Sequence, residues 1–194
     1  MSMTPYTPKN FSALLGTSGL SDILLTNHFA LYEGYVKNVN MLIELLPAKT
    51  PGTPEHTELK RRFGWEWNGM RLHELYFENL NKEETLSDPS SDLREKITAS
   101  FGTFEAWSEE FFGIALMRGI GWVVLTLDEA TGQLFNTWIN EHDGGHLAGS
   151  KPLLVLDVFE HAYITDYGIK RADYVTLCKT HINWKVVSER IVRS

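Results

Sequence analysis

The chain has 194 residues, of which 43% are hydrophobic and 22% are charged, and its formal net charge is −7 at pH 7. That composition excludes a wholly disordered or fibrous protein, and the negative charge argues against nucleic acid or an anionic membrane as a main partner. The apolar runs, such as those at 122–125 and 153–156, fall well short of the roughly 20 residues that cross a bilayer. The single cysteine, Cys178, excludes an intrachain disulfide, and residues 1–11 lack the features of a secretory signal. We therefore expect a soluble protein of the reducing cytoplasm.

The first half of the chain predicts two long helices. Residues 1–19, with several prolines and glycines, form an irregular arm. From residue 24 to 46 apolar side chains recur at steps of three and four, the period of an amphipathic helix, with Ser21 as its N-cap. A second helical pattern, at 59–80, follows Thr53-Pro54, a cap with proline at the first helical position. The short turn between the two patterns predicts an antiparallel helical hairpin.

The second half of the chain predicts a mixed α/β unit. The Asp88-Pro89 linker divides the chain into an arm and hairpin at 1–88 and a C-terminal unit at 89–194. The predicted elements of this unit are helices at 92–98, 103–118 and 172–191 and strands at 122–127, 133–139 and 153–157. The fold class is therefore α+β, a helical hairpin followed by a three-stranded antiparallel sheet flanked by helices.

Several catalytic motifs are missing from the chain. There is no Gly-rich phosphate loop with its lysine, and no Gly-x-Ser-x-Gly elbow that would present a serine nucleophile. Cys178 lies on an apolar helix face, which favours a buried, inert thiol over a nucleophile. The histidines therefore carry the candidate chemistry.

Some of the seven histidines stand at spacings that suit a metal ligand. His28 lies seven residues before Tyr35, on the same helix face, and His73 belongs to a stripe on the second helix. Asp157 ends a buried strand and His161 follows four residues later, so a carboxylate and an imidazole can converge on one ion. The alternative for each helical histidine is a hydrogen-bonded core residue.

The segment Leu156–Tyr163, Leu-Asp-Val-Phe-Glu-His-Ala-Tyr, resembles the Asp-x-Trp-Glu-His-Ala-Tyr signature of the iron/manganese superoxide dismutases. Other segments resemble further motifs of that family in the same order and spacing: 35–40, 73–77, 100–104, 119–122, 167–174 and 183–184. The resemblance covers residues 21–192. It implies a helical hairpin followed by an α/β domain, and a superoxide dismutase that uses one iron or manganese ion per chain.

The resemblance also implies a metal site between the two units. The ion would be held by three imidazoles and one carboxylate, with a solvent molecule in the fifth position. The ligands that it implies are His28, His73, Asp157 and His161.

The first of these ligands needs a geometric argument. The family's first ligand usually stands eight residues before the tyrosine that matches Tyr35, and a count without gaps arrives at Asn27 instead of His28. A π-bulge adds one residue to a helical turn, so a helix that lacks the bulge returns His28 to the ligand position. Since asparagine is a poor ligand for such an ion, we expect His28.

The resemblance assigns roles around the metal as well. Tyr35 would relay protons at the mouth of the site, and Trp122 would wall the cavity. Where many members carry a glutamine that touches the bound solvent, this chain has Gly69. The partner that replaces it is His142 or His146, and the sequence leaves that choice open. It also leaves open whether the ion is iron or manganese.

The chain departs from the family pattern in places that bear on activity and assembly. Leu31-Tyr32 stands where most members have two histidines, and Val124 and Phe159 replace tryptophans. Glu160 would bridge to the metal-bound His161 of a second subunit, which implies a homodimer, although a tetramer is also open. Alternatives to a dismutase are a non-catalytic relative that keeps the fold as an interaction module, and another metal-dependent enzyme such as an oxygenase.

Overall fold

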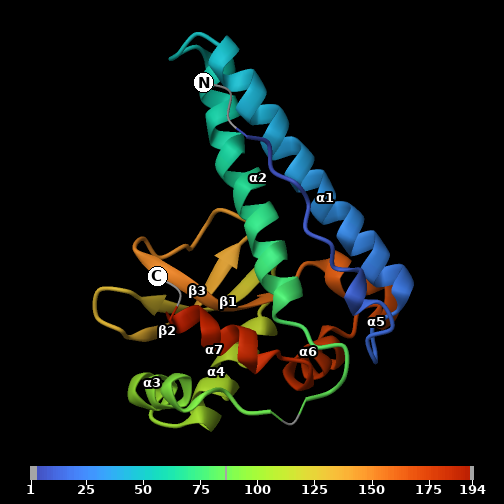
Figure 1. Cartoon of the computed structure of the whole chain (residues 1–194), viewed down its shortest axis with the longest axis vertical. Helices are drawn as coiled ribbons and strands as arrows, with labels where there is room; N and C mark the ends of the chain where they lie inside the picture. Colours follow the sequence, from blue (N-terminus) through green and yellow to red (C-terminus); the bar gives the residue numbers. More distant parts are fainter. Residues whose placement is uncertain (1–3, 86, 193–194) are drawn as a thin grey trace.

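The computed structural model describes residues 4–85 and 87–192 of the chain (Figure 1). Helices α1 (Asp22–Leu45) and α2 (Pro54–Glu78) form a long antiparallel hairpin, connected through a short 3₁₀ helix at Leu46–Ala48. The N-terminal arm runs along this hairpin and includes a 3₁₀ turn at Ser12–Leu14. The predicted helical hairpin is confirmed.

Both predicted helix caps are present. The Ser21 hydroxyl accepts a hydrogen bond from the Leu24 amide at 3.1 Å, and the Thr53 hydroxyl accepts one from the His56 amide at 3.3 Å. Such caps satisfy amides that the first helical turn leaves without partners. Helix α1 is α-helical along its whole length and contains no π turn.

The second half of the chain folds into a small sheet with helices around it. The helices are α3 (Ser91–Phe101), α4 (Phe104–Ala115), α5 (Ile164–Tyr167), α6 (Arg171–Thr180) and α7 (Trp184–Val192), with a 3₁₀ turn at Glu160–Ala162. The strands are β1 (Gly121–Asp128), β2 (Leu134–Asn140) and β3 (Ser150–Asp157). They form an antiparallel sheet in the order β2-β1-β3, which confirms the α+β fold class. Helices α2 and α7 pack against β3, and α4 packs against β1.

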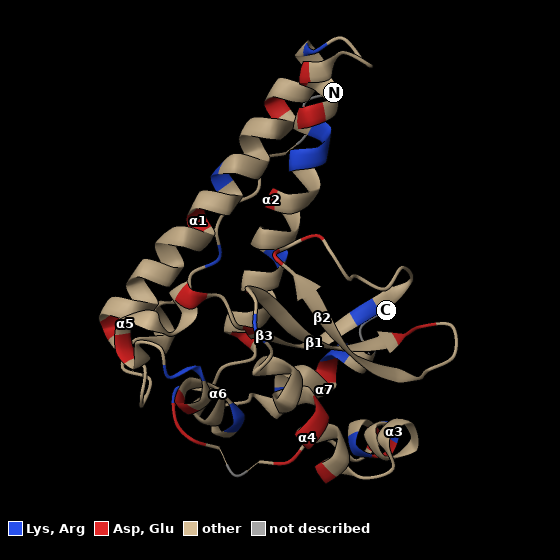
Figure 2. Cartoon of the chain, turned by 180° about the vertical axis from the view of Figure 1, so that it is seen from behind, with Lys and Arg blue, Asp and Glu red and all other residues tan. Residues whose placement is uncertain are grey.

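Charge is unevenly distributed over these elements. Figure 2 shows that Lys, Arg, Asp and Glu lie mainly on helices and loops, whereas the strands are almost uncharged. The exception that matters is Asp157, which is fully buried at the end of β3 beside its β1 partner Trp122. A buried carboxylate is stable only when it is paired or binds a cation, so this end of the sheet requires a partner for Asp157.

One sequence prediction about the fold is wrong. The single closing helix expected at 172–191 is two helices, α6 and α7, separated at residues 181–183. There the chain bonds to the segment that follows α2: the Asn81 amide donates to the His181 carbonyl at 2.7 Å, and the Asn183 amide donates to the Asn79 carbonyl at 2.6 Å. The Asn183 side chain also accepts a bond from the Val186 amide at 3.3 Å and caps α7. These tertiary bonds outweigh the continuous helical pattern.

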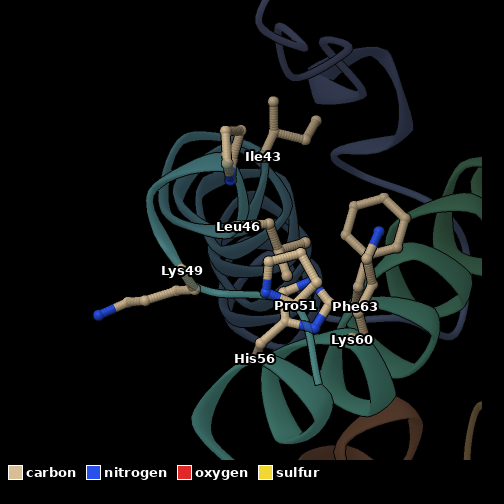
Figure 3. A pocket seen from close by; sticks show the side chains of 8 residues that line it. Ile43, Leu46, Lys49, Pro51, His56, Lys60 and Phe63 are labelled. Carbon is tan, nitrogen blue, oxygen red and sulfur yellow. The ribbon is translucent and has the colours of Figure 1, made fainter. Parts of the chain in front are cut away.

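A hollow of about 380 Å³ lies at the tip of the hairpin, where the end of α1 meets the start of α2 (Figure 3). Apolar side chains such as Ile43, Leu46 and Phe63 line it together with His56, and Lys49 extends away from the other lining residues. Among the described residues, no acidic side chain lines this hollow, so they offer no anionic ligand for a metal ion there. No helix in the described part of the chain is long and apolar enough to cross a membrane.

Candidate metal centre

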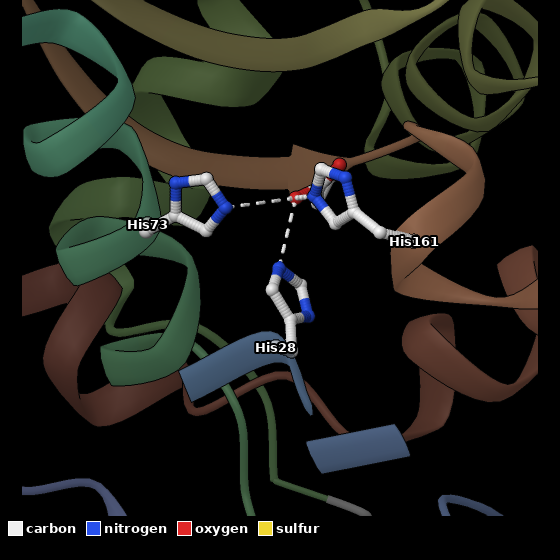
Figure 4. A group of neighbouring side chains, drawn as sticks. His28, His73 and His161 are labelled. Carbon is white, nitrogen blue, oxygen red and sulfur yellow. Dashed lines mark hydrogen bonds and ion pairs between the residues drawn. The ribbon is translucent and has the colours of Figure 1, made fainter. Parts of the chain in front are cut away.

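Four side chains from both halves of the chain converge at the base of the hairpin. Helix α1 contributes His28 and helix α2 contributes His73. The end of β3 contributes Asp157, and the 3₁₀ turn that follows it contributes His161. One nitrogen or oxygen from each lies within 4.8 Å of the others, and Figure 4 shows the imidazoles pointing toward one another. We call these residues the inner cluster: His28, His73, Asp157 and His161.

The spacing within the inner cluster suits ligands of a single ion. The Asp157 Oδ2 atom lies 3.2 Å from Nε2 of His28, 3.7 Å from Nε2 of His73 and 3.1 Å from Nε2 of His161. Two ligand atoms that are each about 2.1 Å from one ion and 90–120° apart are separated by about 3.0–3.6 Å. His28, His73 and Asp157 are at most 1% exposed, and the side chain of His161 is 27% exposed.

Hydrogen bonds outside the cluster orient two of its members. Nδ1–H of His73 donates to the Gly69 carbonyl at 2.6 Å, which leaves the Nε2 lone pair facing the cluster. Oδ1 of Asp157 accepts the Phe159 amide at 2.8 Å, which leaves Oδ2 for the cluster. The Tyr174 hydroxyl donates to the Asp157 main-chain carbonyl at 2.8 Å and anchors the end of the strand.

The protonation of the cluster follows from its burial. Desolvation lowers the pKa of His28 and holds the pKa of His73 well below its usual range, so both rings are neutral. Burial alone would raise the pKa of Asp157, but the imidazoles of His161 and His28 hold it well below its usual range, so the carboxylate is ionised.

A bound cation resolves an electrostatic conflict inside the cluster. His73 Nε2 is buried with no hydrogen-bond partner, and its lone pair faces the negatively charged Asp157 Oδ2 at 3.7 Å. Two buried lone pairs that face each other repel, whereas a cation between them would accept both. The imidazole and carboxylate donors suit iron and manganese. The residues present therefore fit such an ion.

A second set of buried side chains adjoins the inner cluster. His142 Nε2 lies 2.7 Å from the Tyr35 hydroxyl, and the Trp122 indole N–H donates to His142 Nδ1 at 3.0 Å. The Tyr35 ring also stacks on the His73 ring, with centroids 5.1 Å apart. We call this set the outer group: Tyr35, His142 and Trp122.

The direction of each bond in the outer group follows from its donors. Burial lowers the pKa of His142 to about 4, so its ring is neutral at pH 7 and carries one N–H. An indole nitrogen can only donate, so Nδ1 of His142 is the acceptor and Nε2 holds the proton. The Nε2–H therefore donates to the Tyr35 oxygen, which leaves the Tyr35 hydroxyl proton free to donate elsewhere.

The structure places the competing candidates in different surroundings. Asn27 is exposed on α1, whereas His28 lies in the inner cluster, as the regular helix requires. His142 contacts Tyr35, whereas His146 is exposed and its Nε2 bonds to the His142 main-chain carbonyl at 2.8 Å. Cys178 is buried, and desolvation raises the pKa of its thiol to about 12, which agrees with an inert side chain.

Sequence reasoning missed two contributions from α2. The carbonyl of Gly69 orients His73, and a Cβ atom on Gly69 would lie only 2.6 Å from the Tyr35 ring, so glycine is what lets the phenol pack there. Trp65 packs against both Tyr35 and His142. The four-residue interval between Gly69 and His73 is a signal for the first contribution, because carbonyl i−4 lies beside residue i in a helix. The packing of Trp65 against Tyr35 and His142 has no such signal in the sequence.

Comparisons with known proteins agree with this geometry. Residues 89–190 match the C-terminal domain of iron/manganese superoxide dismutases. The chain is 38% identical to a superoxide dismutase [Fe] of Cupriavidus metallidurans, with 89% of each chain covered. It is 34% identical to a superoxide dismutase [Fe] of Aquifex pyrophilus, which covers 96% of this chain and 91% of the relative. It is also 34% identical to superoxide dismutase [Mn] 2 of Haloferax volcanii, over 84% of this chain and 81% of the relative.

The chain belongs to the iron/manganese superoxide dismutase family. The donor set of the inner cluster and the iron and manganese relatives together support one iron or manganese ion per chain. Because relatives of both kinds match at similar identity, the comparisons do not separate the two metals.

The departures from the superoxide dismutase pattern have structural consequences. Tyr32 is buried, and its hydroxyl donates to Glu74 at 3.0 Å, so this position bonds within the hairpin. Val124 lines a hollow of about 410 Å³ between the sheet and α2. Phe159 stacks on both the His142 and the His161 rings, at 4.9 and 5.1 Å between centroids. Phe159 therefore still supplies an aromatic wall between the inner cluster and the outer group.

Proposed function

We propose that this chain disproportionates superoxide to dioxygen and hydrogen peroxide at one iron or manganese ion. Its ligands would be the Nε2 atoms of His28, His73 and His161 and the Oδ2 atom of Asp157. The observation that carries the proposal is the convergence of these four atoms within 4.8 Å, with the lone pair of a neutral, buried His73 facing an ionised Asp157. The site would lie between the helical unit, residues 1–88, and the C-terminal unit, residues 89–194.

The reaction turns two superoxide anions and two protons into one dioxygen and one hydrogen peroxide. An ion in this site supplies the one-electron oxidation and the one-electron reduction. The chain contributes a single negative charge, on Asp157, beside the neutral imidazoles of His28 and His73. Because this single negative charge is smaller than that of a divalent or trivalent ion, the loaded site would stay positive and attract an anion.

The outer group supplies a route for the protons. The single N–H of His142 is used on Tyr35, so the phenol proton is the one free to donate toward a bound anion. Burial raises the pKa of Tyr35 well above its usual value, so the phenol keeps its proton at pH 7. Tyr35 is 8% exposed, which leaves an edge from which the proton can be replaced by solvent.

The tightness of the site favours a small substrate. Three of the four proposed ligands are almost fully buried, and aromatic rings pack around them, including Phe77 at 4.8 Å from the His28 ring. A diatomic anion fits such surroundings better than the organic substrate of an oxygenase.

The direct test is to load the protein with iron and with manganese separately and to measure superoxide removal by each form. We expect one bound ion per chain and a rate far above that of the free metal in at least one form. A protein that binds an ion stoichiometrically yet removes superoxide no faster than free metal would instead be a non-catalytic relative. A protein that binds neither metal would contradict the ligand assignment as well.

We also infer that the protein is a homodimer in which Glu160 bonds to His161 of the partner subunit. Exposed apolar side chains surround Glu160 at a hollow of about 940 Å³: Leu116, Met117, Ile120 and Ile169. Ile169 is 97% exposed, and such a patch on a water-soluble surface is typical of an interface. The mass measured by light scattering should be that of two chains.

The substitution Ile169→Lys should shift that mass toward one chain. Ile23→Lys is a matched control, because Ile23 is also exposed, at 68%, but does not line this hollow. A monomeric wild-type protein would refute the dimer without affecting the metal site proposal.

A further inference from the structure

Trp65 on α2 packs against two members of the outer group, Tyr35 and His142. Its ring centroid lies 4.4 Å from that of His142, at a steep angle of 73°, and 5.7 Å from that of Tyr35. Tyr35 and His142 are the pair joined at 2.7 Å by the bond described above. Trp65 therefore contacts the two ends of one hydrogen bond, from the hairpin side.

The same indole is tied to the loop that carries His142. Its Nε1–H donates to the Glu141 carboxylate at 3.2 Å. Glu141 has a φ of 49° and is the one residue other than glycine with positive φ in the described part of the chain. This left-handed backbone is strained for a residue with a side chain, and such strain persists only where surrounding contacts hold it. The bond from Trp65 is a contact of that kind, immediately before His142.

The orientation of Trp65 is held from its outer side. The guanidinium of Arg62 lies over the indole ring, 3.9 Å from its centroid. Arg62 in turn donates to Glu66 at 2.7 Å, and Glu66, only 2% exposed, accepts a second bond from Asn38 of α1 at 3.1 Å. Both helices of the hairpin thus fix the indole before it contacts the loop.

We propose that Trp65 is a positioning residue for the Tyr35–His142 hydrogen bond. It holds the strained Glu141 turn against α2 and presses the two rings together, so that the His142 N–H stays on the phenol oxygen. The catalytic consequence rests on the proposed function, in which Tyr35 delivers a proton. The structural consequence, a fixed loop at residues 141–146, does not depend on that function.

Three variants of the metal-loaded protein test the proposal. Trp65→Ala removes both the ring contacts and the bond to Glu141, whereas Trp65→Phe keeps a ring and removes the bond. Trp67→Ala is the matched control, because Trp67 lies on the same helix, is also half-buried, and packs against Tyr6 and Phe63 instead. Each variant is measured for metal content, for kcat and KM, and for amide hydrogen exchange of residues 141–146.

We expect full metal content in all three variants. In Trp65→Ala, kcat should fall about tenfold while kcat/KM changes less than about threefold, because a misplaced proton donor slows a step after binding. Exchange of the 141–146 amides should become about fivefold faster, because the loop opens locally. Trp65→Phe should lie between Trp65→Ala and the wild type, and Trp67→Ala should match the wild type. A crystal structure of Trp65→Ala should show Tyr35 and His142 farther apart than 2.7 Å.

The proposal is overturned if the Trp65→Phe and Trp65→Ala proteins keep wild-type kcat and wild-type loop exchange. It is also overturned if Trp67→Ala has the same effects as Trp65→Ala, since the effect would then be one of general helix packing. If Trp65→Ala fails to fold, Trp65→Phe decides, and unchanged loop exchange in that variant refutes the tie to Glu141. A wild-type protein that binds metal without removing superoxide refutes the proposed function, while the exchange data still test the loop.

Discussion

The inner cluster and the outer group are both buried and both contain neutral imidazoles, but they differ in whether the nitrogen lone pairs have a hydrogen-bond donor. In the inner cluster, His73 donates its only proton outward to Gly69, and its lone pair faces the carboxylate of Asp157. In the outer group, the lone pair of His142 is satisfied by the Trp122 N–H, and its proton is satisfied by Tyr35. The first arrangement is incomplete without a cation, whereas the second is complete by itself.

This difference teaches how to assign roles to buried histidines. A buried imidazole whose unpartnered lone pair faces an ionised carboxylate, as in His73, is a candidate ligand, and one with both nitrogens satisfied, as in His142, is a candidate relay or spacer. Removing a ligand should therefore abolish metal binding, whereas changing the relay should leave the metal in place and change the rate.

The largest effect should come from His28→Ala. Removing one of four proposed ligands should weaken metal binding by more than about 100-fold, since even changes behind the ligands cost about 10–100-fold. The measurement is metal content after dialysis against a chelator. Asn27→Ala is the matched control, because Asn27 is the exposed neighbour that a gapless count selects. Equal metal loss in both variants would contradict the helical register of α1.

The next largest effect should come from His142→Ala, with metal content unchanged. Loss of the N–H that orients Tyr35 should lower kcat by about 10–100-fold, less than the roughly 100–10,000-fold that a general acid itself contributes, because the Tyr35 phenol remains in place. His142→Gln offers an amide N–H toward Tyr35 and an oxygen toward Trp122, so it should retain far more activity than the alanine variant. If His142→Ala instead lost its metal, the division between the inner cluster and the outer group would be wrong.

Gly69→Ala should disturb both sets at once, and more mildly. The added Cβ would lie 2.6 Å from the Tyr35 ring, so the ring has to move, at a cost of about 1–3 kcal/mol in the free energy of unfolding. Alanine's better helix propensity would offset about 1 kcal/mol of that cost. Gly64→Ala on the same helix meets nothing within 4 Å and should be neutral or stabilising. Denaturant unfolding of both variants decides, and equal stability would show that the Tyr35 ring is loosely held.

The last comparison concerns the pH dependence of the metal-free protein. His142, whose pKa burial lowers to about 4, is protonated in the unfolded chain near pH 6.5 but in the folded chain only near pH 4. The unfolded state therefore binds the proton first, and the free energy of unfolding falls as pH falls from about 6.5 toward about 4. His28 and His73 act in the same direction.

The test is denaturant unfolding in a chelator at several pH values. His142→Gln should make the fall shallower without removing it, because two buried histidines of the inner cluster remain. A variant with the same slope as the wild type would show that His142 is already protonated, or exposed, in the folded state.

Much of the fold was predictable from local pattern. The helical period and the caps Ser21 and Thr53 predict α1 and α2, because an amphipathic stripe and a capped first turn are properties of a few neighbouring residues. The break between α6 and α7 was not predictable in that way. It depends on backbone bonds from residues 181–183 to residues 79–81, which lie about a hundred positions earlier in the chain.

The candidate site shows the same contrast between features set by neighbouring residues and features set by contacts between distant segments. The sequence by itself determined which residue types were available and, through their spacing and family resemblance, which four side chains to test as ligands. Only the tertiary structure decided that His142 rather than His146 contacts Tyr35, and that Trp65 packs against both of these residues. The physical reason is that spacing along a helix or strand fixes the direction of a side chain, whereas a contact between α2 and the 141–146 loop depends on how two distant segments pack.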